Sequence, residues 1–312
     1  MTDRYIVLGD NHGDTASLRH VLDDADGDSF DYAVHVGDFT RAWRTGRQED
    51  DEQLGKRRGG EQLRAVEPLL ERLDERAEHG LLWVYGNQDY FGDLPYGLTV
   101  GTEIPDDGRV TVGGQRFTNS PSAVAPDVVL VTHVEKWSLI DHFEGRAHFC
   151  GNTHRGRHRD RRLNSAFLKL TDPEDGETTY GGYFVVEVSE SGPLDVECRP
   201  IGDLERRECD RHGERGVQFQ PSTRDCMYCG DQRVLMREMS ASAFYGLTVD
   251  NARTAVDDER LVAYAVELWN DPPEGFESAF EAYLADIETD RYAPLARTND
   301  GQLTVAEQSY AY

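Results

Sequence analysis

Residues of three metal-binding types, Asp, Asn and His, stand directly after five apolar runs in the first half of the chain. Short apolar runs are typical of buried β-strands, and polar side chains at the ends of strands can converge although they are far apart in sequence. Oxygen ligands mixed with imidazoles, without thiolates, favour divalent metals such as Mn, Fe, Ni or Zn. The spacing therefore predicts a metal centre at the ends of the strands. Its candidate ligands are Asp10, His12, Asp38, Asn87, His133, Asn152 and His154.

These residues, in this order, resemble the motifs of the calcineurin-like metallophosphoesterases. The resemblance covers roughly the first two thirds of the chain, and motifs in a fixed order are more specific than any one of them alone. It implies a hydrolase, a phosphatase or phosphodiesterase, that acts on phosphate esters. The family pattern D-x-H, G-D, G-N-H-D/E, H and G-H-x-H is matched by Asp10–His12, Gly37–Asp38, Gly86–Asp89, His133 and Gly151–His154.

The resemblance also implies how the ligands divide between two metal ions. Asp38 would bridge ions that lie about 3.5–4 Å apart, and a hydroxide activated by both metals would attack phosphorus in line. No nucleophile from the protein is needed in this mechanism. The first ion would be held by Asp10, His12, Asp38 and His154, and the second by Asp38, Asn87, His133 and, in a typical member, a histidine at position 152.

Two positions depart from the family pattern. Gln88 stands where many members carry a histidine that helps to protonate the leaving group, and a glutamine cannot act as that acid. Asn152 replaces a histidine ligand of the second ion, which puts the occupancy of that site in question. An alternative hypothesis is therefore a metal-binding or nucleic-acid-binding module with a degenerate catalytic site. The candidates for catalysis are Asp38, Asn87, Gln88 and Asp89, the last of which would orient a neighbouring group.

Other histidines lie near these motifs. His35 is inside the second apolar run, where a hydrogen-bonded core histidine is the simpler interpretation. Three more lie close to Asn152 in sequence and are alternatives for the missing nitrogen, although surface or strand roles are the simpler interpretation for each. They are His142, His148 and His158.

The most basic stretch of the chain begins directly after His154 and ends at Arg162. Arginine makes planar, bidentate contacts with phosphate, so this stretch could form a substrate clamp beside the metals. A loop paired with the acidic surface is the alternative, and the sequence does not decide between them. The candidate substrate-binding residues are Arg155, Arg157 and Arg41.

The chain is strongly acidic, with 59 Asp and Glu against 33 Lys and Arg and a net charge of −26. Only three of the 33 are lysine, which is a halophilic composition, and the 38% hydrophobic content in clear periodic patterns argues against a disordered acidic chain. Because the Debye length is only ~3 Å in 1 M salt, the net charge does not decide whether the phosphate ester substrate is a nucleotide or a nucleic acid.

The amino terminus has no features of a targeting segment. The first apolar run begins at Tyr5, which leaves no room for a signal peptide. No uninterrupted apolar run approaches the ~20 residues of a membrane span. We therefore expect a soluble, cytoplasmic protein with no membrane partner.

The pattern of apolar residues indicates an α/β fold, a two-sheet β-sandwich flanked by helices, over residues 1–202. A helix is expected after its N-cap Asp14, and another from Glu61 to Ala77. The polar segment 39–60 has almost no apolar periodicity and is predicted to be a mobile loop or a functional lid. A β-hairpin is expected at 109–118. Strands at 166–170, 183–188 and 194–198 are expected to complete the second sheet.

Residues 203–312 are predicted to form a small zinc-binding module rich in helices. The spacing C-x2-H-x13-C-x2-C is typical of a tetrahedral structural zinc site, and the β-α-β pattern of a redox C-x-x-C protein is missing. Amphipathic stretches at 261–269 and 276–284 predict the helices. The predicted zinc ligands are Cys209, His212, Cys226 and Cys229.

Overall fold

The computed structural model describes residues 2–134, 143–165, 167–171, 178–208, 217–220, 295–297 and 303–305. The chain divides into two compact units, the first formed by Met1–Glu135 with Phe143–Arg224 and the second by Lys136–His142 with Asp225–Tyr312. The described residues of the second unit form a hairpin of β17 (Leu295–Arg297) and β18 (Leu303–Val305). The candidate metal ligands all belong to the first unit.

The first unit contains a six-stranded sheet in the order β14-β13-β1-β2-β3-β4. Its strands β1 to β4 are parallel, so that their carboxyl ends meet at one edge, whereas β13 is antiparallel to β1 and to β14. The strands are β1 (Asp3–Leu8), β2 (Tyr32–His35), β3 (Leu81–Trp83), β4 (Thr102–Glu103), β13 (Gly182–Val188) and β14 (Asp195–Pro200).

An eight-stranded sheet in the order β15-β16-β9-β10-β8-β7-β6-β5 forms the second layer. Strands β6, β7, β8 and β10 are parallel, whereas β5 and β6 form the expected antiparallel hairpin. The strands are β5 (Arg109–Val112), β6 (Gln115–Thr118), β7 (Val128–Val131), β8 (Ala147–Cys150), β9 (Gly156–Arg159), β10 (Arg162–Asn164), β15 (Glu205–Arg207) and β16 (Val217–Gln220). A separate pair consists of β11 (Lys169–Thr171) and β12 (Thr178–Tyr180).

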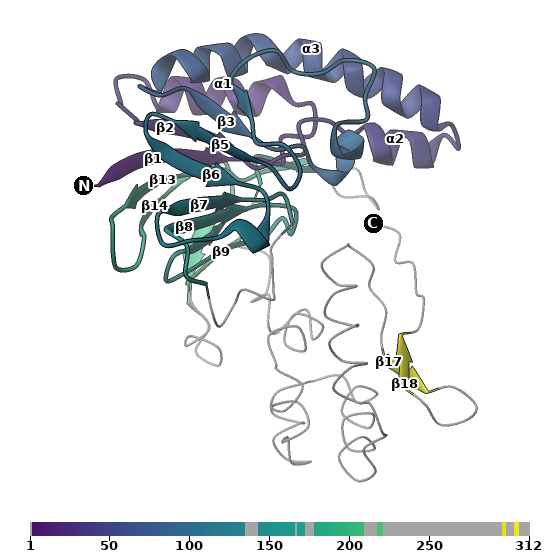
Figure 1. The fold of residues 1–312 in the computed structure, drawn as a ribbon. Helices are drawn as coiled ribbons and strands as arrows, with labels where there is room; N and C mark the ends of the chain where they lie inside the picture. Colours follow the sequence, from purple (N-terminus) through teal and green to yellow (C-terminus); the bar gives the residue numbers. More distant parts are fainter. Residues whose placement is uncertain are drawn as a thin grey trace. The chain divides into compact units, whose positions relative to one another are not determined.

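The two sheets share one hydrophobic core, which confirms the predicted two-sheet arrangement. Side chains alternate across each strand: Tyr5 and Val7 of β1 lie in the core that also contains Phe149 of β8, whereas Ile6 and Leu8 face the helices. The helices α1 and α3 cover the outer face of the six-stranded sheet, and the eight-stranded sheet lies on its other side (Figure 1).

Helix α1 (Thr15–Asp24) begins as predicted. The Asp14 carboxylate accepts a hydrogen bond of 2.7 Å from the N–H of Ser17, which is the geometry of an N-cap. Short 3-10 helices follow β3 and β6. They are η1 (Asn87–Gly92) and η2 (Pro121–Ala123).

The segment predicted to be a loop or lid is helical. Helix α2 (Ala42–Gln48) is followed by α3 (Glu52–Arg76), which begins nine residues before the predicted start at Glu61. The two helices touch through glycines, since a Cβ at Gly55 would lie 2.5 Å from the Ala42 carbonyl oxygen. Because α2 and α3 pack through backbone atoms at glycines, the sequence of this segment has no apolar periodicity. The hydrophobic pattern of residues 39–60 therefore predicts a loop instead of helices.

Three strand assignments also differ from the expectation. The strand expected at 166–170 is β11, which pairs with β12 in a separate two-stranded sheet. Strands β13 and β14 extend the six-stranded sheet rather than the second one, because alternation identifies a buried face but not the neighbouring strand. Strands β15 and β16 lie beyond residue 202, where we placed the domain boundary, and β16 pairs with β9. The boundary itself stays a prediction.

Of the helices in the described ranges, none combines the length and the apolar character that crossing a membrane requires.

Candidate metal centre

The candidate ligands lie in the loops at the carboxyl ends of strands from both sheets. Asp10 follows β1, Asp38 follows β2, and Asn87 follows β3. The other sheet supplies His133 after β7 and His154 after β8. Parallel pairing within each sheet places these ends side by side, and the shared core brings the two edges together.

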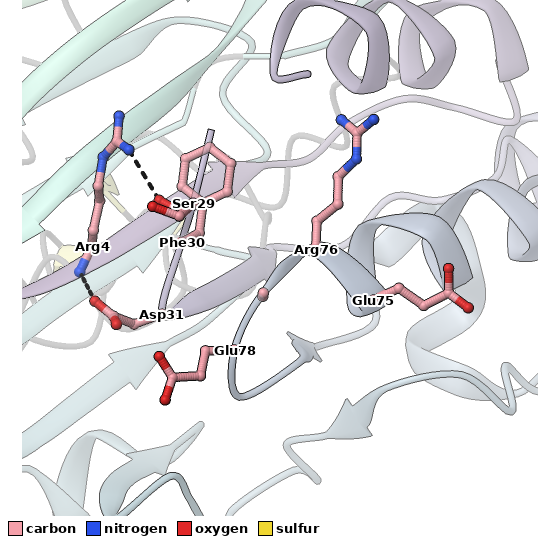
Figure 2. A pocket seen from close by; sticks show the side chains of 8 residues that line it. Arg4, Ser29, Phe30, Asp31, Glu75, Arg76 and Glu78 are labelled. Atoms are coloured by element: carbon pink, nitrogen blue, oxygen red, sulfur yellow. Dashed lines mark hydrogen bonds between the residues drawn. The ribbon is translucent and has the colours of Figure 1, made fainter. Parts of the chain in front are cut away.

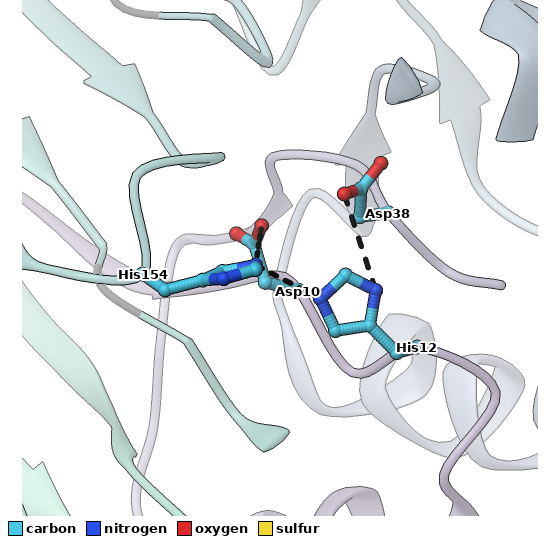
Figure 3. A group of neighbouring side chains, drawn as sticks. All are labelled: Asp10, His12, Asp38 and His154. Atoms are coloured by element: carbon cyan, nitrogen blue, oxygen red, sulfur yellow. Dashed lines mark hydrogen bonds and ion pairs between the residues drawn. The ribbon is translucent and has the colours of Figure 1, made fainter. Parts of the chain in front are cut away.

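Four of the ligands form one compact group. Each offers a ligand atom, and these atoms all lie within 4.8 Å of one another. The Nε2 atoms of His12 and His154 are 3.0 Å apart, and the Nε2 atom of His154 is 3.4 Å from Oδ1 of Asp10 (Figure 3). Oδ2 of Asp38 lies 4.0 Å from the His12 ring. This is the set that the family resemblance assigns to the first metal.

The backbone is left-handed at five of the candidate ligands. Non-glycine residues rarely adopt positive φ, and each such position costs on the order of 1–3 kcal/mol unless its surroundings hold it there. Asp, Asn and His tolerate this region best, which matches the residue types found. The φ values are 55° at Asp10, 50° at His12, 58° at Asp38, 69° at Asn152 and 50° at His154.

Glycines let the ligand loops approach each other closely. A Cβ at Gly86 would overlap Oδ1 of Asp38, and a Cβ at Gly151 would lie 2.5 Å from Oδ2 of Asp10. Both glycines belong to the motifs that carry the family resemblance, and the structure gives their physical reason.

A second group lies beside the first. The Nε2 atom of His133 is 2.9 Å from Oδ1 of Asn87 and 3.3 Å from Oδ1 of Asp38. Asp38 therefore directs one carboxylate oxygen toward His133 and the other toward His12. This is the arrangement that a bridging carboxylate requires.

The charges and proton positions of this site fit a bound cation. Nδ1 of His133 lies 2.8 Å from the Val36 carbonyl oxygen and must donate its proton there, so Nε2 faces two oxygen acceptors. Without a metal, burial would lower the pKa of His133, but the charge of Asp38 outweighs burial and raises it to about 10. A cation beside His133 would bind the same two oxygens, Oδ1 of Asn87 and Oδ1 of Asp38.

The first group fits a cation for a related reason. Burial lowers the pKa of His12 to about 3, so its ring is neutral and keeps a lone pair for a metal. Asp10 and Asp38 are buried carboxylates, and buried charges are costly unless they are paired or coordinate a metal.

Asp89 ties two ligand loops together. Its buried carboxylate accepts hydrogen bonds from the N–H groups of Phe39, Thr40 and Gly86 and from the Thr40 hydroxyl. Burial and the charge of Asp38 raise the pKa of Asp89, and these hydrogen bonds act in the opposite direction. Asp89 thereby positions the loops that carry Asp38 and Asn87.

Gln88 makes contacts that position Asp38 and helix α2 and, among the described residues, none that an acid catalyst would need. Its N–H donates to Oδ1 of Asp38 at 2.8 Å, and its side-chain Oε1 accepts from the N–H of Arg44 at 3.2 Å. The amide thus caps the first turn of α2. Sequence patterns did not indicate this contact because α2 itself was not predicted.

Asn152 contributes its backbone to the site. Its N–H donates to both oxygens of Asp10, at 3.1 and 3.3 Å. The Nε2 atom of His148 pairs with the Thr132 hydroxyl at 2.9 Å, and that of His158 with the Asp160 carbonyl at 3.2 Å. Neither belongs to the four-residue group, and His142 lies outside the described residues.

His35 is a core histidine, as predicted. Its ring is fully buried, pairs with Oδ1 of Asn11 at 3.0 Å, accepts from the N–H of Gly37, and stacks on Phe39. Sequence patterns gave no indication of the side-chain contact of Asn11 with His35. They also gave none of the contacts made by the Val36 and Thr40 carbonyl groups, because a backbone contact does not depend on residue type.

The basic stretch after His154 forms β9, β10 and the turn between them. Arg161 donates to the carbonyl oxygens of Gly145, Glu190 and Gly192, a structural role that neither sequence interpretation included. Arg157 is buried and has a partner within the protein. Nη1 of Arg155 is buried and has no hydrogen-bond partner within the described part of the chain.

The predicted zinc ligands Cys209, His212, Cys226 and Cys229 lie outside the described residues.

A pocket of about 440 Å³ lies at the opposite end of the parallel strands (Figure 2). It is bordered by the first residues of β1 and by the end of α3, far along the strands from the ligand loops. Arg4 donates to the Ser29 carbonyl oxygen there, and Arg76 to the Leu22 carbonyl oxygen, so both guanidinium groups serve the fold. The ligand loops, rather than this pocket, are the candidate site.

The sequence matches no protein-family model and no curated protein. The structure is similar to that of an uncharacterized protein, a predicted phosphoesterase, from Streptococcus pneumoniae (18% identity, 64% of this chain and 90% of that chain, TM-score 0.34). It is also similar to Yfce, a phosphoesterase from E. coli (16%, 60% and 88%, TM-score 0.28), and to a metallophosphoesterase from Sphaerobacter thermophilus (14%, 86% and 99%, TM-score 0.31).

Proposed function

We propose that this protein is a metal-dependent phosphoesterase that hydrolyses a phosphomonoester or phosphodiester. The observation that carries the proposal is the convergence of the His12 and His154 Nε2 atoms, 3.0 Å apart, between the buried carboxylates of Asp10 and Asp38. Divalent cations at such a site lower the pKa of water and neutralise phosphoryl oxygens.

The side chains divide into a stronger and a weaker set of ligands. The first set has two carboxylates and two imidazoles, from Asp10, His12, Asp38 and His154. The second set shares Asp38 and adds His133 with the neutral Asn87 and Asn152. Amide oxygens are weaker donors than imidazole nitrogens toward late first-row metals such as Fe, Ni and Zn. We therefore propose two divalent metals of unequal affinity.

The leaving group must depart without a proton from Gln88, because the side-chain amide of Gln88 accepts a hydrogen bond from α2. Esters with good leaving groups, such as aryl or nucleotide groups, suit this arrangement. Arg155 follows His154 directly, and its Nη1 atom has no partner among the described residues. We assign to Arg155 a bidentate contact with the phosphoryl oxygens, a role for which the internally paired Arg157 is less suited.

Hydrolysis of two chromogenic esters tests the proposal. The purified protein should release p-nitrophenol from bis-p-nitrophenyl phosphate or p-nitrophenyl phosphate when manganese is added, and chelation should abolish the reaction. The assay belongs in molar KCl because of the acidic composition. Metal binding without hydrolysis of either ester, under saturating manganese, would instead support the alternative of a binding module with a degenerate site.

A further inference from the structure

Partly buried arginines in the described part of the chain almost always have partners. Arg76 donates to the Leu22 carbonyl oxygen, and Arg199 pairs with Asp28. Arg146 pairs with Asp3 at 2.6 Å. These contacts follow from the cost of removing a guanidinium group from water without a hydrogen-bond acceptor.

Arg41 and Arg44 are exceptions to this rule. Both are partly buried, and across the described residues neither guanidinium group has a hydrogen bond or an ion pair. Arg41 is the residue before α2 and Arg44 lies three positions further on, a spacing that places two side chains on the same face of a helix. Burial lowers the pKa of Arg41, and the positive charge of Arg44 lowers it further. Two adjacent cations without a carboxylate are unexpected in a chain with a net charge of −26.

The backbone of this pair is anchored to the loops that carry the metal ligands. The carbonyl oxygen of Thr40, the residue before Arg41, lies 3.4 Å from Nδ1 of His12. The N–H of Arg41 donates to Oε1 of Gln62 at 2.9 Å, and that of Arg44 donates to Oε1 of Gln88 at 3.2 Å. The backbones of both arginines are therefore held next to the loops that carry the metal ligands.

We propose that Arg41 and Arg44 form a subsite for a second phosphate group of the substrate. Two guanidinium groups can each bind a phosphate bidentately, and such contacts persist at salt concentrations that screen long-range attraction. The substrate class is therefore a phosphate ester that carries another phosphate next to the scissile one. This inference rests on the proposed function, in which the metals and Arg155 take the scissile phosphate.

Calorimetry with inorganic pyrophosphate and inorganic phosphate tests the subsite on the manganese-loaded full chain. Pyrophosphate presents two adjacent phosphates and should bind at least about tenfold more tightly than phosphate, the effect expected for added charge-assisted hydrogen bonds. In Arg41→Gln and in Arg44→Gln this preference should fall about tenfold. Equal affinities in the wild-type protein, or an unchanged preference in both variants, would overturn the proposal.

Two further variants make the result specific. Arg47→Gln is the matched control, because Arg47 lies on the same helix but is exposed and rests against the Trp43 ring at 4.8 Å. It should keep the full preference for pyrophosphate. Arg41→Lys keeps the charge but not the bidentate fork, so it should lose part of the preference even if the glutamine variant fails to fold. A lysine variant with the full wild-type preference would contradict the role of Arg41.

The calorimetric readout separates this inference from the proposed function. Arginine-dependent binding of pyrophosphate in a protein that hydrolyses no ester would uphold the subsite and reject the enzyme. Ester hydrolysis without any preference for pyrophosphate would uphold the enzyme and reject the subsite.

Discussion

The Nε2 atoms of His12 and His154 lie 3.0 Å apart although 142 residues separate the two histidines in sequence. Their rings are perpendicular, with centroids 5.0 Å apart, and approach with the nitrogen atoms foremost. Two nitrogen lone pairs that face each other repel at this distance unless a proton or a cation lies between them. The flanking carboxylates of Asp10 and Asp38 favour a divalent cation.

Gly86 should be essential for the position of Asp38. A Cβ at Gly86 would overlap Oδ1 of Asp38, so Gly86→Ala must displace the carboxylate that faces both ligand groups. A displacement of about 1 Å can cost about 100-fold in rate, and we expect at least this loss in kcat/KM. Steady-state hydrolysis of bis-p-nitrophenyl phosphate measures it. Gly97→Ala is the control, because its Cβ would meet only Tyr85 at an ordinary 3.5 Å, and comparable losses in both variants would contradict this role.

Asn152→His should tighten the second metal site. An imidazole is a better donor than an amide oxygen toward late first-row metals, and the positive φ of Asn152 is one that His12 and His154 also adopt. We expect the weaker of two metal-binding steps, measured with nickel or zinc by calorimetry, to strengthen about tenfold. The stronger step should not change. Asn152→Ala is the control, and a histidine variant that binds no better than alanine would reject the assignment.

Glu67 should stabilise the fold in a pH-dependent way. Its carboxylate accepts hydrogen bonds from the Tyr96 hydroxyl and from the N–H and hydroxyl groups of Thr99. Burial acts to raise the pKa of Glu67, but these hydrogen bonds outweigh it and lower the pKa below its ordinary value of 4.5. Because the folded pKa is lowered, the stabilisation is present above pH 4.5 and is lost as the pH falls through the folded pKa.

Glu67→Gln tests this linkage. We expect the free energy of unfolding at neutral pH to fall by about 0.5–1 kcal/mol, a small effect because Glu67 is largely screened by solvent. The variant and the wild-type protein should converge in acid, at about pH 3. Urea denaturation at both pH values measures the difference. Glu71→Gln, at an exposed position on the same helix, is the control, and a deficit that persists in acid would refute the linkage.

The predicted zinc module can be tested independently of the metal centre. If Cys226 is a zinc ligand, Cys226→Ser should lose one zinc per chain while the protein keeps the metal bound at Asp10. Structural zinc contributes on the order of 10 kcal/mol of apparent binding free energy in small domains, so protease resistance after about residue 203 should fall sharply. An unchanged zinc content, measured by elemental analysis, would exclude this ligand.

The candidate site could be predicted from sequence because each ligand lies within a few residues of the end of a strand. An apolar run such as Val128–Val131 predicts a strand, and strand ends converge, so residue type and position together indicated His133. The contacts that position the ligands could not be predicted. The Val36 carbonyl group and the Gln88 amide act through geometry, and neither leaves a periodic pattern.

The fold was predictable where side chains carry the packing, as for α1 and the β5–β6 hairpin. It was missed where backbone carries the packing. Gly55 and Gly59 bring α2 against α3 without apolar side chains, so the sequence pattern predicts a loop there. Strand β9, with two arginines among four residues, was missed because its burial does not follow from hydrophobicity.

Metal content and hydrolysis measured together on Asp38→Asn test the central claim most directly. Asp38 faces His12 with one oxygen and His133 with the other, so loss of its charge should weaken both metal sites. We predict that the purified variant retains less than one metal per chain besides the predicted structural zinc, and that hydrolysis of bis-p-nitrophenyl phosphate falls at least about 100-fold at saturating manganese. Near-native turnover with two metals still bound besides the structural zinc would contradict the proposed metal-dependent phosphoesterase.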